Sequence, residues 1–564
     1  MISVSGKNWE KQKVNKNLVE KVKQDYGFGD ILSQLIISRN YDASEIYSIN
    51  NNQKLINIFK DDYDFKKASL ILLNSIKNNE NICILGDYDV DGTCATSLLV
   101  RYFNHINQKH FFYIPDRVND GYGASKKLFQ KLILKKPKLI IMVDCGSTSN
   151  EAIDYLNKQN IQSIIIDHHE INKPYPKSGA IINPKKQPTY KENSFLCATT
   201  LTYFFIDILI KKNKSSFNLS NFLIYVLLAT ICDVMPLRKI NKIIAHNTLE
   251  NFNLKNNAAL DYIFNQYNLK KKLTTEDLGF LIGPIINAGG RLNHSKYGVE
   301  LLTSDDKEII KDRSNKLIIL NNKRKKIEEN ILNKIDFENI KKENKDVIIF
   351  YRNNLNEGLI GIIASRLKDY FNKPSIVITN SNNNLKASAR STKLYNIGNL
   401  IKLLIDKNII DNGGGHNMAA GFTIKKTNIK LLDNFIQNDY SKKISNINSR
   451  KIYDMELSLF AIKHKFINDI NKLGPFGNYN SMPIFLIKNV GIIKSEIIKN
   501  KHVSTIIKSD LGASVKAMCF NCFNTKLGEY LLSYKKKMNI IAEIHENIWN
   551  NKKTIQLNIK DLIL

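Results

Sequence analysis

Three short apolar runs in the first third of the chain each end abruptly at acidic or histidine-containing residues. The runs are Asn81–Leu85, Leu139–Val143 and Ile161–Ile166. Uninterrupted apolar runs of this length are typical of parallel strands that are buried on both faces. The segments 92–102 and 150–158 between them have a helical pattern, so strand, loop and helix alternate. The sequence therefore predicts a doubly wound α/β parallel-sheet domain, in which ligands bind at the carboxyl ends of the strands.

A second, smaller α/β pattern follows a long segment without glycine or proline. Acidic residues that favour a helix start precede that segment, and we expect one charged helix from Asp305 to about Lys342 that joins two domains. The second pattern comprises a strand at Val347–Tyr351, a helix at Leu359–Tyr370, a strand at Ser375–Thr379 and a glycine-rich loop at Gly413–Gly421.

After Ser445 the pattern changes to short strands and turns, which fits a small β-barrel of the OB-fold type. We expect its aromatic residues to include some that stack on nucleic-acid bases. These aromatic residues are Phe460, Phe476, Tyr479, Phe485, Phe520, Phe523 and Trp549. The expected organisation is an N-terminal helical region at 1–65, the first α/β domain at 66–250, a connecting segment with the long helix at 251–345, the second α/β domain at 346–440 and the barrel at 441–564.

Composition adds a candidate partner. The chain of 564 residues has 83 Lys and Arg against 53 Asp and Glu, a net charge of +30, and such an excess attracts polyanions such as nucleic acid. A gene rich in codons for Lys, Asn and Ile explains the charge equally well, so charge alone decides little. Seven irregularly spaced cysteines do not form a disulfide framework, and the start lacks the apolar region of a signal peptide, which predicts a cytoplasmic protein. The apolar run Phe222–Cys232 is too short to cross a bilayer and suits a buried helix.

The first acidic loop is GDYDVDG at Gly86–Gly92. Asp87, Asp89 and Asp91 alternate along it, and alternation places them on one side of an extended segment. Three converging carboxylates repel one another unless a divalent cation neutralises them. The alternatives are an acidic surface turn or a calcium loop, although the full EF-hand spacing is absent.

Three more clusters follow apolar runs at the predicted strand and helix ends: Asp144, the triplet Asp167, His168 and His169, and Asp233. Four such clusters in one predicted domain indicate a metal site, and mixed carboxylate and imidazole ligands suit Mn²⁺ better than Mg²⁺. Cys145 could instead be a nucleophile, but the neighbouring carboxylates discourage its thiolate.

The lone CxxC of Cys519 and Cys522 has no second ligand pair nearby, so both cysteines are predicted to be packing residues.

The motifs GDYDVDG, VDCG, IDHHE and CDVMPL, in this order, resemble the four motifs of the DHH phosphoesterase family. Further resemblance to the single-strand-specific DNA exonucleases of that family extends along nearly the whole chain. It is carried by YIPDRVNDGYG at Tyr113–Gly123, INPK at Ile182–Lys185, GPIINAGGRLNH at Gly283–His294, SARS at Ser388–Ser391, GGGHNMAAGF at Gly413–Phe422 and WNNKKTIQLNIKDL at Trp549–Leu562.

The resemblance implies a set of site residues. The catalytic metal ligands would be Asp89, Asp91, Asp144, His168, His169 and Asp233, with Asp87 and Asp167 as further ligands or as direct neighbours of the ligands. Phosphates of the DNA would be bound by Arg291, Ser388, Arg390 and His416, and Gly414 and Gly415 would let the backbone approach them closely.

Two segments depart from the family pattern: LCATTL at Leu196–Leu201 stands where a glycine-rich segment is usual, and GNYNSMP at Gly477–Pro483 stands for the usual GNPxP turn.

The implied activity is 5′-to-3′ exonuclease cleavage of single-stranded DNA by a two-metal mechanism, with two divalent cations, Mn²⁺ preferred or Mg²⁺. It also implies a role in DNA recombination and repair, with a single-strand-binding protein and a helicase as partners. We expect a monomer that contacts no membrane. Two alternatives stay open: a phosphodiesterase for short oligonucleotides or cyclic dinucleotides, and a non-catalytic DNA-binding protein that keeps the nuclease fold.

Overall fold

The computed structural model describes residues 1–564 except Asn52, 117–119, 121–122, 187–192, Lys270, Asn293, 382–383, 445–449, Lys535 and 550–551. Five residues of the YIPDRVNDGYG motif therefore lie outside the described residues, namely Arg117, Val118, Asn119, Gly121 and Tyr122. The chain forms two compact units, one of residues 56–235 and 251–447 and one of residues 1–55, 236–250 and 448–564. Among the described helices, none combines the length and apolar character that a membrane crossing requires.

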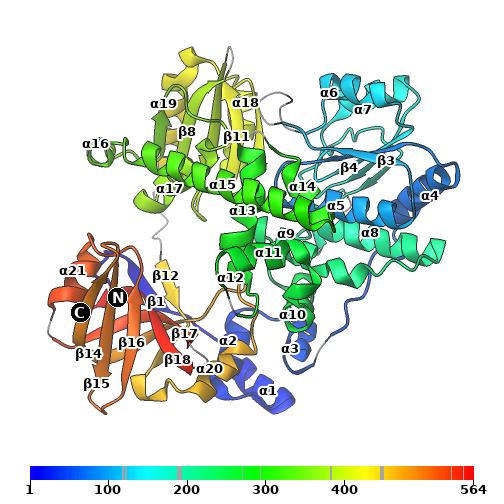
Figure 1. The fold of residues 1–564 in the computed structure, drawn as a ribbon. Coiled ribbons are helices and arrows are strands. Elements are labelled where there is room, and N and C mark those ends of the chain that lie inside the picture. The colour runs from blue at the N-terminus through cyan, green and yellow to red at the C-terminus, as the bar shows by residue number, and fades with distance from the viewer. Residues whose placement is uncertain are drawn as a thin grey trace. The chain divides into compact units, whose positions relative to one another are not determined.

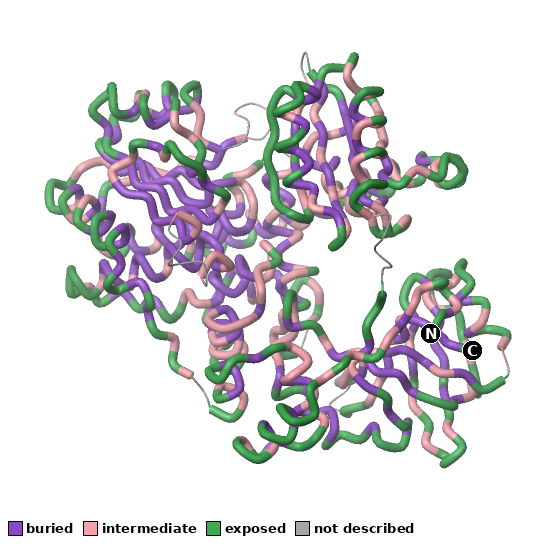
Figure 2. The backbone as a smooth tube through the Cα atoms, turned by 180° about the vertical axis from the view of Figure 1, so that it is seen from behind, coloured by how far each residue is buried: buried purple, intermediate pink, exposed green. Residues whose placement is uncertain are grey.

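The larger unit begins with a parallel sheet of five strands in the order β3-β2-β4-β5-β6. Ile, Leu, Val and Met predominate in its middle strands, and these residues are buried. Figure 2 shows the strands of this domain in the colour of buried residues. The predicted doubly wound domain is confirmed. The strands are β2 (Ile82–Gly86), β3 (His110–Tyr113), β4 (Leu139–Val143), β5 (Gln162–Ile166) and β6 (Ala180–Ile182).

Helices cover both faces of this sheet (Figure 1). Helices α6 and α7 lie on one face, and α4, α5 and α8 lie on the other. The predicted core helix is α9, whose residues from Ile224 to Thr230 are all buried. The bounds are α4 (Tyr63–Lys77), α5 (Val90–His105), α6 (Lys126–Leu132), α7 (Asn150–Lys158), α8 (Ala198–Asn213) and α9 (Leu223–Cys232).

A series of helices connects the first sheet to the second. The expected single helix from Asp305 to Lys342 is wrong, because two helices occupy this segment. The first ends at Leu332, Ile335 is buried in the turn, and Asp336 accepts a hydrogen bond from Asn339 N at 2.9 Å as the N-cap of the second. The helices are α11 (Ala258–Gln266), α12 (Thr275–Asp277), the π-helical turn η5 (Leu278–Ile282), α13 (Gly283–Arg291), α14 (Tyr297–Thr303), α15 (Lys307–Leu332) and α16 (Phe337–Glu343).

The second sheet of this unit is mixed, with the strand order β10-β11-β9-β8-β7. The segment Gly413–Gly421, which we expected to be a loop, is instead most of an antiparallel hairpin in which Gly414 pairs with Gly421. The smaller α/β domain is confirmed. Its elements are β7 (Ile348–Tyr351), α17 (Ile360–Phe371), β8 (Ser375–Ser381), β9 (Asn384–Arg390), α18 (Ile397–Asp406), β10 (Asn412–His416), β11 (Ala419–Ile424) and α19 (Ile429–Ile444).

The other unit contains the predicted barrel. Strands β14, β15, β16, β18 and β17 pair in this order, and β17 pairs back with β14 to close the barrel. Strand β13 (Met455–Leu457) adds to β14, and β12 (Arg450–Tyr453) pairs with the N-terminal strand β1 (Asn8–Lys11). The barrel elements are β14 (Ile484–Ile498), β15 (His502–Ser509), β16 (Ser514–Cys519), α21 (Lys526–Ser533), β17 (Met538–Trp549) and β18 (Lys552–Ile563).

Two segments distant in sequence complete the barrel unit. Residues 1–55 provide α1 (Lys16–Tyr26), α2 (Asp30–Ser38) and α3 (Ala43–Asn50), and most of α10 (Lys239–Asn251) belongs to the same unit. Arg238 joins these segments through its ion pair with Glu45 and its hydrogen bonds to the carbonyls of Arg39 and Asn40.

Candidate metal centre and phosphate cradle

The first acidic loop follows β2 and leads directly into α5. Asp89 caps this helix by accepting a hydrogen bond from Gly92 N at 3.1 Å. A Cβ atom at Gly92 would lie 2.5 Å from the backbone N and O of Asp87, so only glycine permits this tight turn. Oxygens of Asp87 and Asp89 gather with Asp144, whereas an oxygen of Asp91 gathers with other residues. The loop therefore contributes oxygens to two of the candidate metal groups.

Asp144 follows β4 in the left-handed conformation, with φ at +60°. Its N–H donates to the carbonyl of Ile166 at 2.9 Å, which holds the residue at the end of the sheet. Backbone strain of this kind is concentrated at functional sites. Asp144 Oδ1 lies 3.3 Å from His168 Nε2 and 3.7 Å from His169 Nδ1.

Asp167 has a different task from the other aspartates. Its Oδ1 accepts hydrogen bonds from the backbone N of His168 and of His169 and lies 2.8 Å from His169 Nδ1, while its Oδ2 accepts from Ser147 N. A histidine whose Nδ1 binds a carboxylate presents its Nε2 to a metal. Burial alone would raise the pKa of Asp167, but the hydrogen bond from His169 holds it below its usual range. Asp167 is therefore placed to orient His169 and is absent from the candidate metal groups among the described residues.

His168 lies at the centre of the converging side chains. Its Nε2 is 3.7 Å from Asp91 Oδ2, 3.3 Å from Asp144 Oδ1 and 3.4 Å from Asp233 Oδ2. Asp233 reaches this point from the C-terminal end of α9. All four clusters singled out in the sequence thus meet at one edge of the sheet. The candidate metal groups are Asp87, Asp89 and Asp144; Asp91, His168 and Asp233; and Asp144, His168 and His169.

Two buried carboxylate oxygens indicate that this cluster can hold divalent cations. Asp144 Oδ1 and Asp233 Oδ2 accept no hydrogen bond from any residue that the structure describes. Burial and neighbouring carboxylates, Asp91 first among them, raise the pKa of both groups well above the usual range. Burial also lowers the pKa of His168 to about 4, so its ring is neutral. Carboxylates that cannot all ionise together, beside a neutral imidazole, are a donor set that divalent cations satisfy.

Asp91 is also held from the side of α8. Its Oδ2 accepts a hydrogen bond from Ala198 N at 2.7 Å, and its Oδ1 accepts from Thr199 N at 2.8 Å and from Thr199 Oγ1 at 2.6 Å. These donors belong to LCATTL, the segment that departs from the family pattern. In this chain the segment supplies two backbone donors at the start of α8 and the hydroxyl of Thr199.

Two glycines of α13 pack against segments that carry ligands. A Cβ atom at Gly290 would lie 2.2 Å from the carbonyl O of Tyr88 in the acidic loop, and one at Gly283 would lie 2.2 Å from Cys232 Sγ, next to Asp233. Because α13 ends at Arg291, this close packing also fixes Arg291 relative to the acidic loop.

Three of the predicted phosphate-binding residues lie near the start of α17. Arg291 Nη1 donates to the carbonyl of Gly358 at 3.0 Å, and Arg390 Nη1 donates to Ser388 Oγ at 3.3 Å. A Cβ atom at Gly361 would lie 3.0 Å from both Arg390 Nη2 and Ser388 Oγ, so the second residue of α17 faces this pair. Guanidinium groups beside a helix N-terminus form a cradle for an anion.

His416 connects the two α/β domains of this unit. Its ring stacks on that of His169 with centroids 5.8 Å apart. Burial lowers the pKa of His416, and the charge of Lys185 lowers it further, so the ring is neutral. In the same hairpin, a Cβ atom at Gly414 would meet nothing within 4 Å, whereas one at Gly415 would lie 2.4 Å from the carbonyl O of Ala419. Gly414 thus leaves open space for a ligand, and Gly415 is required by the hairpin itself.

Sequence reasoning missed the neighbours that brace the ligands. Asn183 Nδ2 donates to Ser147 Oγ at 2.8 Å and to the carbonyl of His169 at 3.0 Å, and Lys185 pairs with Glu170 at 3.1 Å. Asn183 and Lys185 lie in INPK, which carried the family resemblance but no assigned role. Their position directly after β6, beside the triplet strand, is the signal that could have identified them.

The environment of Cys145 does not favour the nucleophile considered from the sequence. All seven are free thiols. Burial and the charge of Asp167 raise the pKa of Cys145 well above its usual range, which argues against a thiolate nucleophile. Cys519 and Cys522 are buried in the barrel, which confirms their prediction as packing residues.

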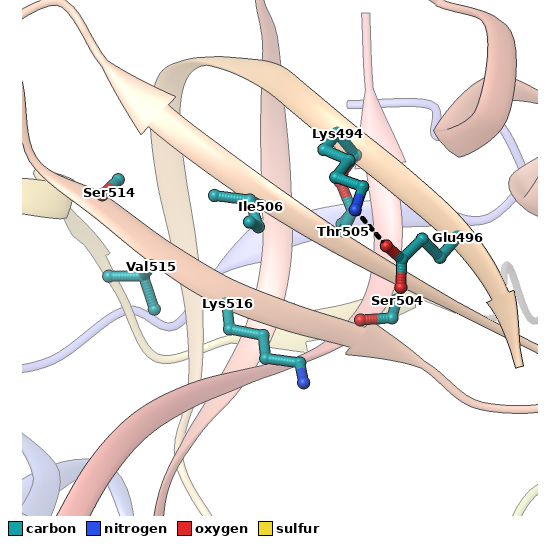
Figure 3. Close-up of a pocket in the computed structure, with 8 residues that line it drawn as sticks. All are labelled: Lys494, Glu496, Ser504, Thr505, Ile506, Ser514, Val515 and Lys516. Carbon is teal, nitrogen blue, oxygen red and sulfur yellow. Dashed lines mark hydrogen bonds and ion pairs between the residues drawn. The ribbon is translucent and has the colours of Figure 1, made fainter.

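The barrel carries a shallow cavity of about 240 Å³ on the outer face of β14, β15 and β16 (Figure 3). Lys494, Ile506 and Lys516 form a row across the three strands, and Lys494 pairs with Glu496. No aromatic residue is among the eight that line the cavity.

Of the seven aromatic residues singled out in the barrel region, Phe460, Tyr479 and Phe520 are exposed, whereas Phe485 is fully buried. The side chain of Trp549 lies outside the described residues.

Comparison with known proteins identifies three domains. Residues 81–231 match the model of the DHH family, N-terminal domain, residues 344–442 match the DHHA1 domain, and residues 453–561 match the RecJ OB domain.

Among curated proteins, the single-stranded-DNA-specific exonuclease RecJ of Bacillus subtilis is 26% identical over 98% of this chain and 70% of its own length. The Escherichia coli protein of the same name is 25% identical over 86% and 90%. The crystal structure of RecJ with Mn²⁺ from Thermus thermophilus has a TM-score of 0.83 at 19% identity, covering 99% of this chain and 79% of that one.

Proposed function

The chain belongs to the DHH family, and on that premise we propose that it is a metal-dependent exonuclease that degrades single-stranded DNA. The observation that carries the proposal is the buried cluster of Asp91, Asp144, His168 and Asp233, in which two carboxylate oxygens accept no hydrogen bond from any described residue. Relatives named as single-strand-specific exonucleases match along nearly the whole chain, barrel included, which supports a DNA strand as the substrate.

The metal ligands we propose are the six predicted from the resemblance together with Asp87, divided between two divalent cations, with Mn²⁺ preferred and Mg²⁺ as the alternative. Crystals of RecJ from Thermus thermophilus contain Mn²⁺ or Mg²⁺. When bound, such a pair supplies an activated water and stabilises negative charge on the scissile phosphate. For Asp167, which the sequence left as a ligand or a direct neighbour of the ligands, we propose the second role, in which it orients His169.

The polarity of cleavage that we propose is the one that the family resemblance implies. Arg291, Ser388, Arg390 and the N-terminus of α17 would bind the terminal 5′-phosphate of the strand. His416, stacked on His169, would donate a hydrogen bond from its neutral ring to a phosphate oxygen. Gly414 would let the strand approach the backbone of the hairpin. Cleavage from 5′ to 3′ is the direction we propose.

The barrel would add further contacts to the DNA strand. Lys494 and Lys516 on its outer face suit phosphate contacts, and the exposed rings of Phe460, Tyr479 and Phe520 suit base stacking. We place the enzyme in cytoplasmic DNA recombination and repair as a monomer, with a single-strand-binding protein and a helicase as partners.

Digestion of single strands labelled at either end tests metal, substrate and polarity together. With Mn²⁺ present, a 5′-labelled strand should release its label as a mononucleotide at once, while a 3′-labelled strand should shorten gradually. The same strand annealed to its complement should resist. Release of the 3′ label first would contradict the polarity, and digestion undiminished by a chelator would contradict the metal centre.

A length series of oligonucleotides separates the proposal from its nearest alternative. A phosphodiesterase for short oligonucleotides or cyclic dinucleotides would prefer dimers, whereas the proposed exonuclease should bind longer strands more tightly because the barrel adds contacts. A non-catalytic DNA-binding protein would bind strands of every length without cutting them.

A further inference from the structure

We propose that His294 and Tyr297 form a stacking platform for one base of the bound strand. This inference rests on the proposed function and deepens it, because it names a contact to a nucleobase in a site otherwise built for phosphates. The ring centroids of His294 and Tyr297 are 5.0 Å apart and the ring planes are inclined by only 9°. His294 is exposed to solvent and Tyr297 is partly buried, so the stack has an inner end and an outer end.

Two cationic side chains lie over the ring of Tyr297, the inner member of the stack. Arg313 Cζ lies 4.9 Å from the centroid of the Tyr297 ring, and Lys316 Nζ lies 5.8 Å from it. Stacked rings backed by guanidinium and ammonium groups attract both the π face of a base and the negative charge of its backbone. Exposed imidazole and phenol rings are among the groups on which unpaired bases stack in nucleic-acid-binding proteins.

The platform is rigid before any strand arrives. His294 N donates to the carbonyl of Gly289 at 2.8 Å, and the carbonyl of His294 accepts from Tyr297 N at 3.2 Å. A Cβ atom at Gly289 would lie 2.6 Å from the His294 carbonyl O, so glycine is required for this turn. Arg313 is fixed by ion pairs with Glu300 and Asp312. A fixed aromatic surface binds at a lower entropic penalty than a mobile one.

The location of the platform selects a base of the substrate as its occupant. Arg291 of the phosphate cradle precedes His294 by three residues. Downstream of the platform, Ser295 Oγ donates to the carbonyl of Ile114 at 3.3 Å, at the end of β3. A Cβ atom at Gly298 would lie 2.9 Å from Thr93 Cγ2 on α5, two residues after Asp91. The segment therefore packs against elements that flank the acidic loop and follows Arg291 directly, so a nucleotide held by Arg291 lies next to it.

Two variants and one altered substrate test the proposal. His294→Ala should raise the KM for a single-stranded oligonucleotide roughly tenfold, the effect of losing one stacked base. His294→Phe, which keeps a flat ring, should stay within about twofold of the original protein. Mn²⁺ affinity and the unfolding temperature should be unchanged in both. His105→Ala, which removes another exposed histidine in contact with a ring, Phe217, at the far end of α5, is the matched control.

An abasic nucleotide moved along the first positions of the strand locates the contact. At one position the abasic nucleotide should weaken binding to the original protein about as much as His294→Ala weakens binding of the intact strand. The same abasic strand should bind His294→Ala no more weakly than the intact strand does. If His294→Phe is as impaired as His294→Ala, or if no abasic position interacts with the substitution, no base stacks on His294. If the original protein does not digest strands at all, the proposed function itself fails. Normal digestion with an unchanged KM in His294→Ala would overturn only the platform.

Discussion

Asp144 and Asp561 are both buried carboxylates, but their surroundings are opposite. Asp561 in the barrel unit accepts four hydrogen bonds, from Ser3 Oγ, Ser5 N, Trp9 Nε1 and Leu562 N. Asp144 in the sheet domain faces other carboxylates, and its Oδ1 accepts no hydrogen bond from any described residue. A buried charge that its own protein satisfies stabilises the fold, whereas one left unsatisfied indicates that a ligand completes it. The two residues therefore separate structural from functional use of the same side chain.

Asp144→Asn should show the largest effect. Cleavage should fall about 10³-fold or more, because a ligand of the metal pair is lost. Without metal, the same variant should unfold with a free energy about 1 kcal/mol higher, since one of the mutually repelling carboxylates is gone. Single-turnover cleavage and chemical denaturation in a chelator measure the two effects. Asp154→Asn on the exposed side of α7 is the control. Cleavage by Asp144→Asn at the rate of the original protein would contradict the assignment of Asp144 as a metal ligand.

Asp561→Ala should have the reverse profile. It leaves several buried donors without an acceptor, so the free energy of unfolding of the barrel unit should fall by about 3 kcal/mol. Mn²⁺ affinity should not change, because Asp561 belongs to the unit that does not hold the metal cluster. Denaturation followed by fluorescence, with calorimetric Mn²⁺ titration, checks both points. Asp510→Ala at the exposed Lys537 pair is the control. A variant as stable as the original would refute the structural role of Asp561.

Lys242 is a buried cation that sharpens the comparison within the barrel unit. No described residue accepts a hydrogen bond from its Nζ, which lies 4.8 Å from the centroid of the Tyr41 ring. Burial lowers its pKa to about 8, below its ordinary value of 10.5. The folded protein therefore binds the proton less tightly than the unfolded chain, and the free energy of unfolding should rise with pH between these two values.

Lys242→Met should raise the free energy of unfolding by about 2 kcal/mol at pH 7, because it removes a desolvated charge and keeps the packing. The difference from the original protein should shrink above pH 8 and disappear above about pH 10.5. Denaturation curves across this range measure it, with the exposed Lys465→Met as the control. If the difference in free energy of unfolding between Lys242→Met and the original protein does not vary with pH, the difference comes from packing and not from the charge of Lys242.

Thr199→Val should have the smallest effect. It removes the hydroxyl that donates to Asp91 and keeps the size of the side chain, so Mn²⁺ affinity should fall about tenfold, as is usual for a lost neighbour of a metal ligand. Thr199→Ser, which restores the hydroxyl, should regain most of that affinity. If the Thr199→Val variant binds Mn²⁺ as tightly as the original protein, the backbone N–H groups of Ala198 and Thr199 suffice to hold Asp91.

The sequence predicted the strand ends of the first domain because each buried run stops at an acid or a histidine. The sequence could not show that both oxygens of Asp167 accept hydrogen bonds from the protein, because one of the donors, Ser147 N, is distant in the chain. The sequence also did not predict the break between α15 and α16, because the segment contains no glycine or proline. The break instead coincides with the burial of Ile335 in the turn. Nor does any local pattern reveal that residues 236–250 pack with the barrel unit, because that requires contacts with Glu45.

The hydrogen bonds from Ser3 and Trp9 to Asp561 have a consequence for synthesis on the ribosome. The donors on Ser3 and Trp9 cannot reach Asp561 until more than five hundred later residues have been translated, a wait of roughly 25 to 100 seconds at ordinary elongation rates. The sheet domains have all of their residues available well before that moment. The nascent chain should therefore assemble its sheet domains before the hydrogen bonds of Ser3 and Trp9 to Asp561 can form.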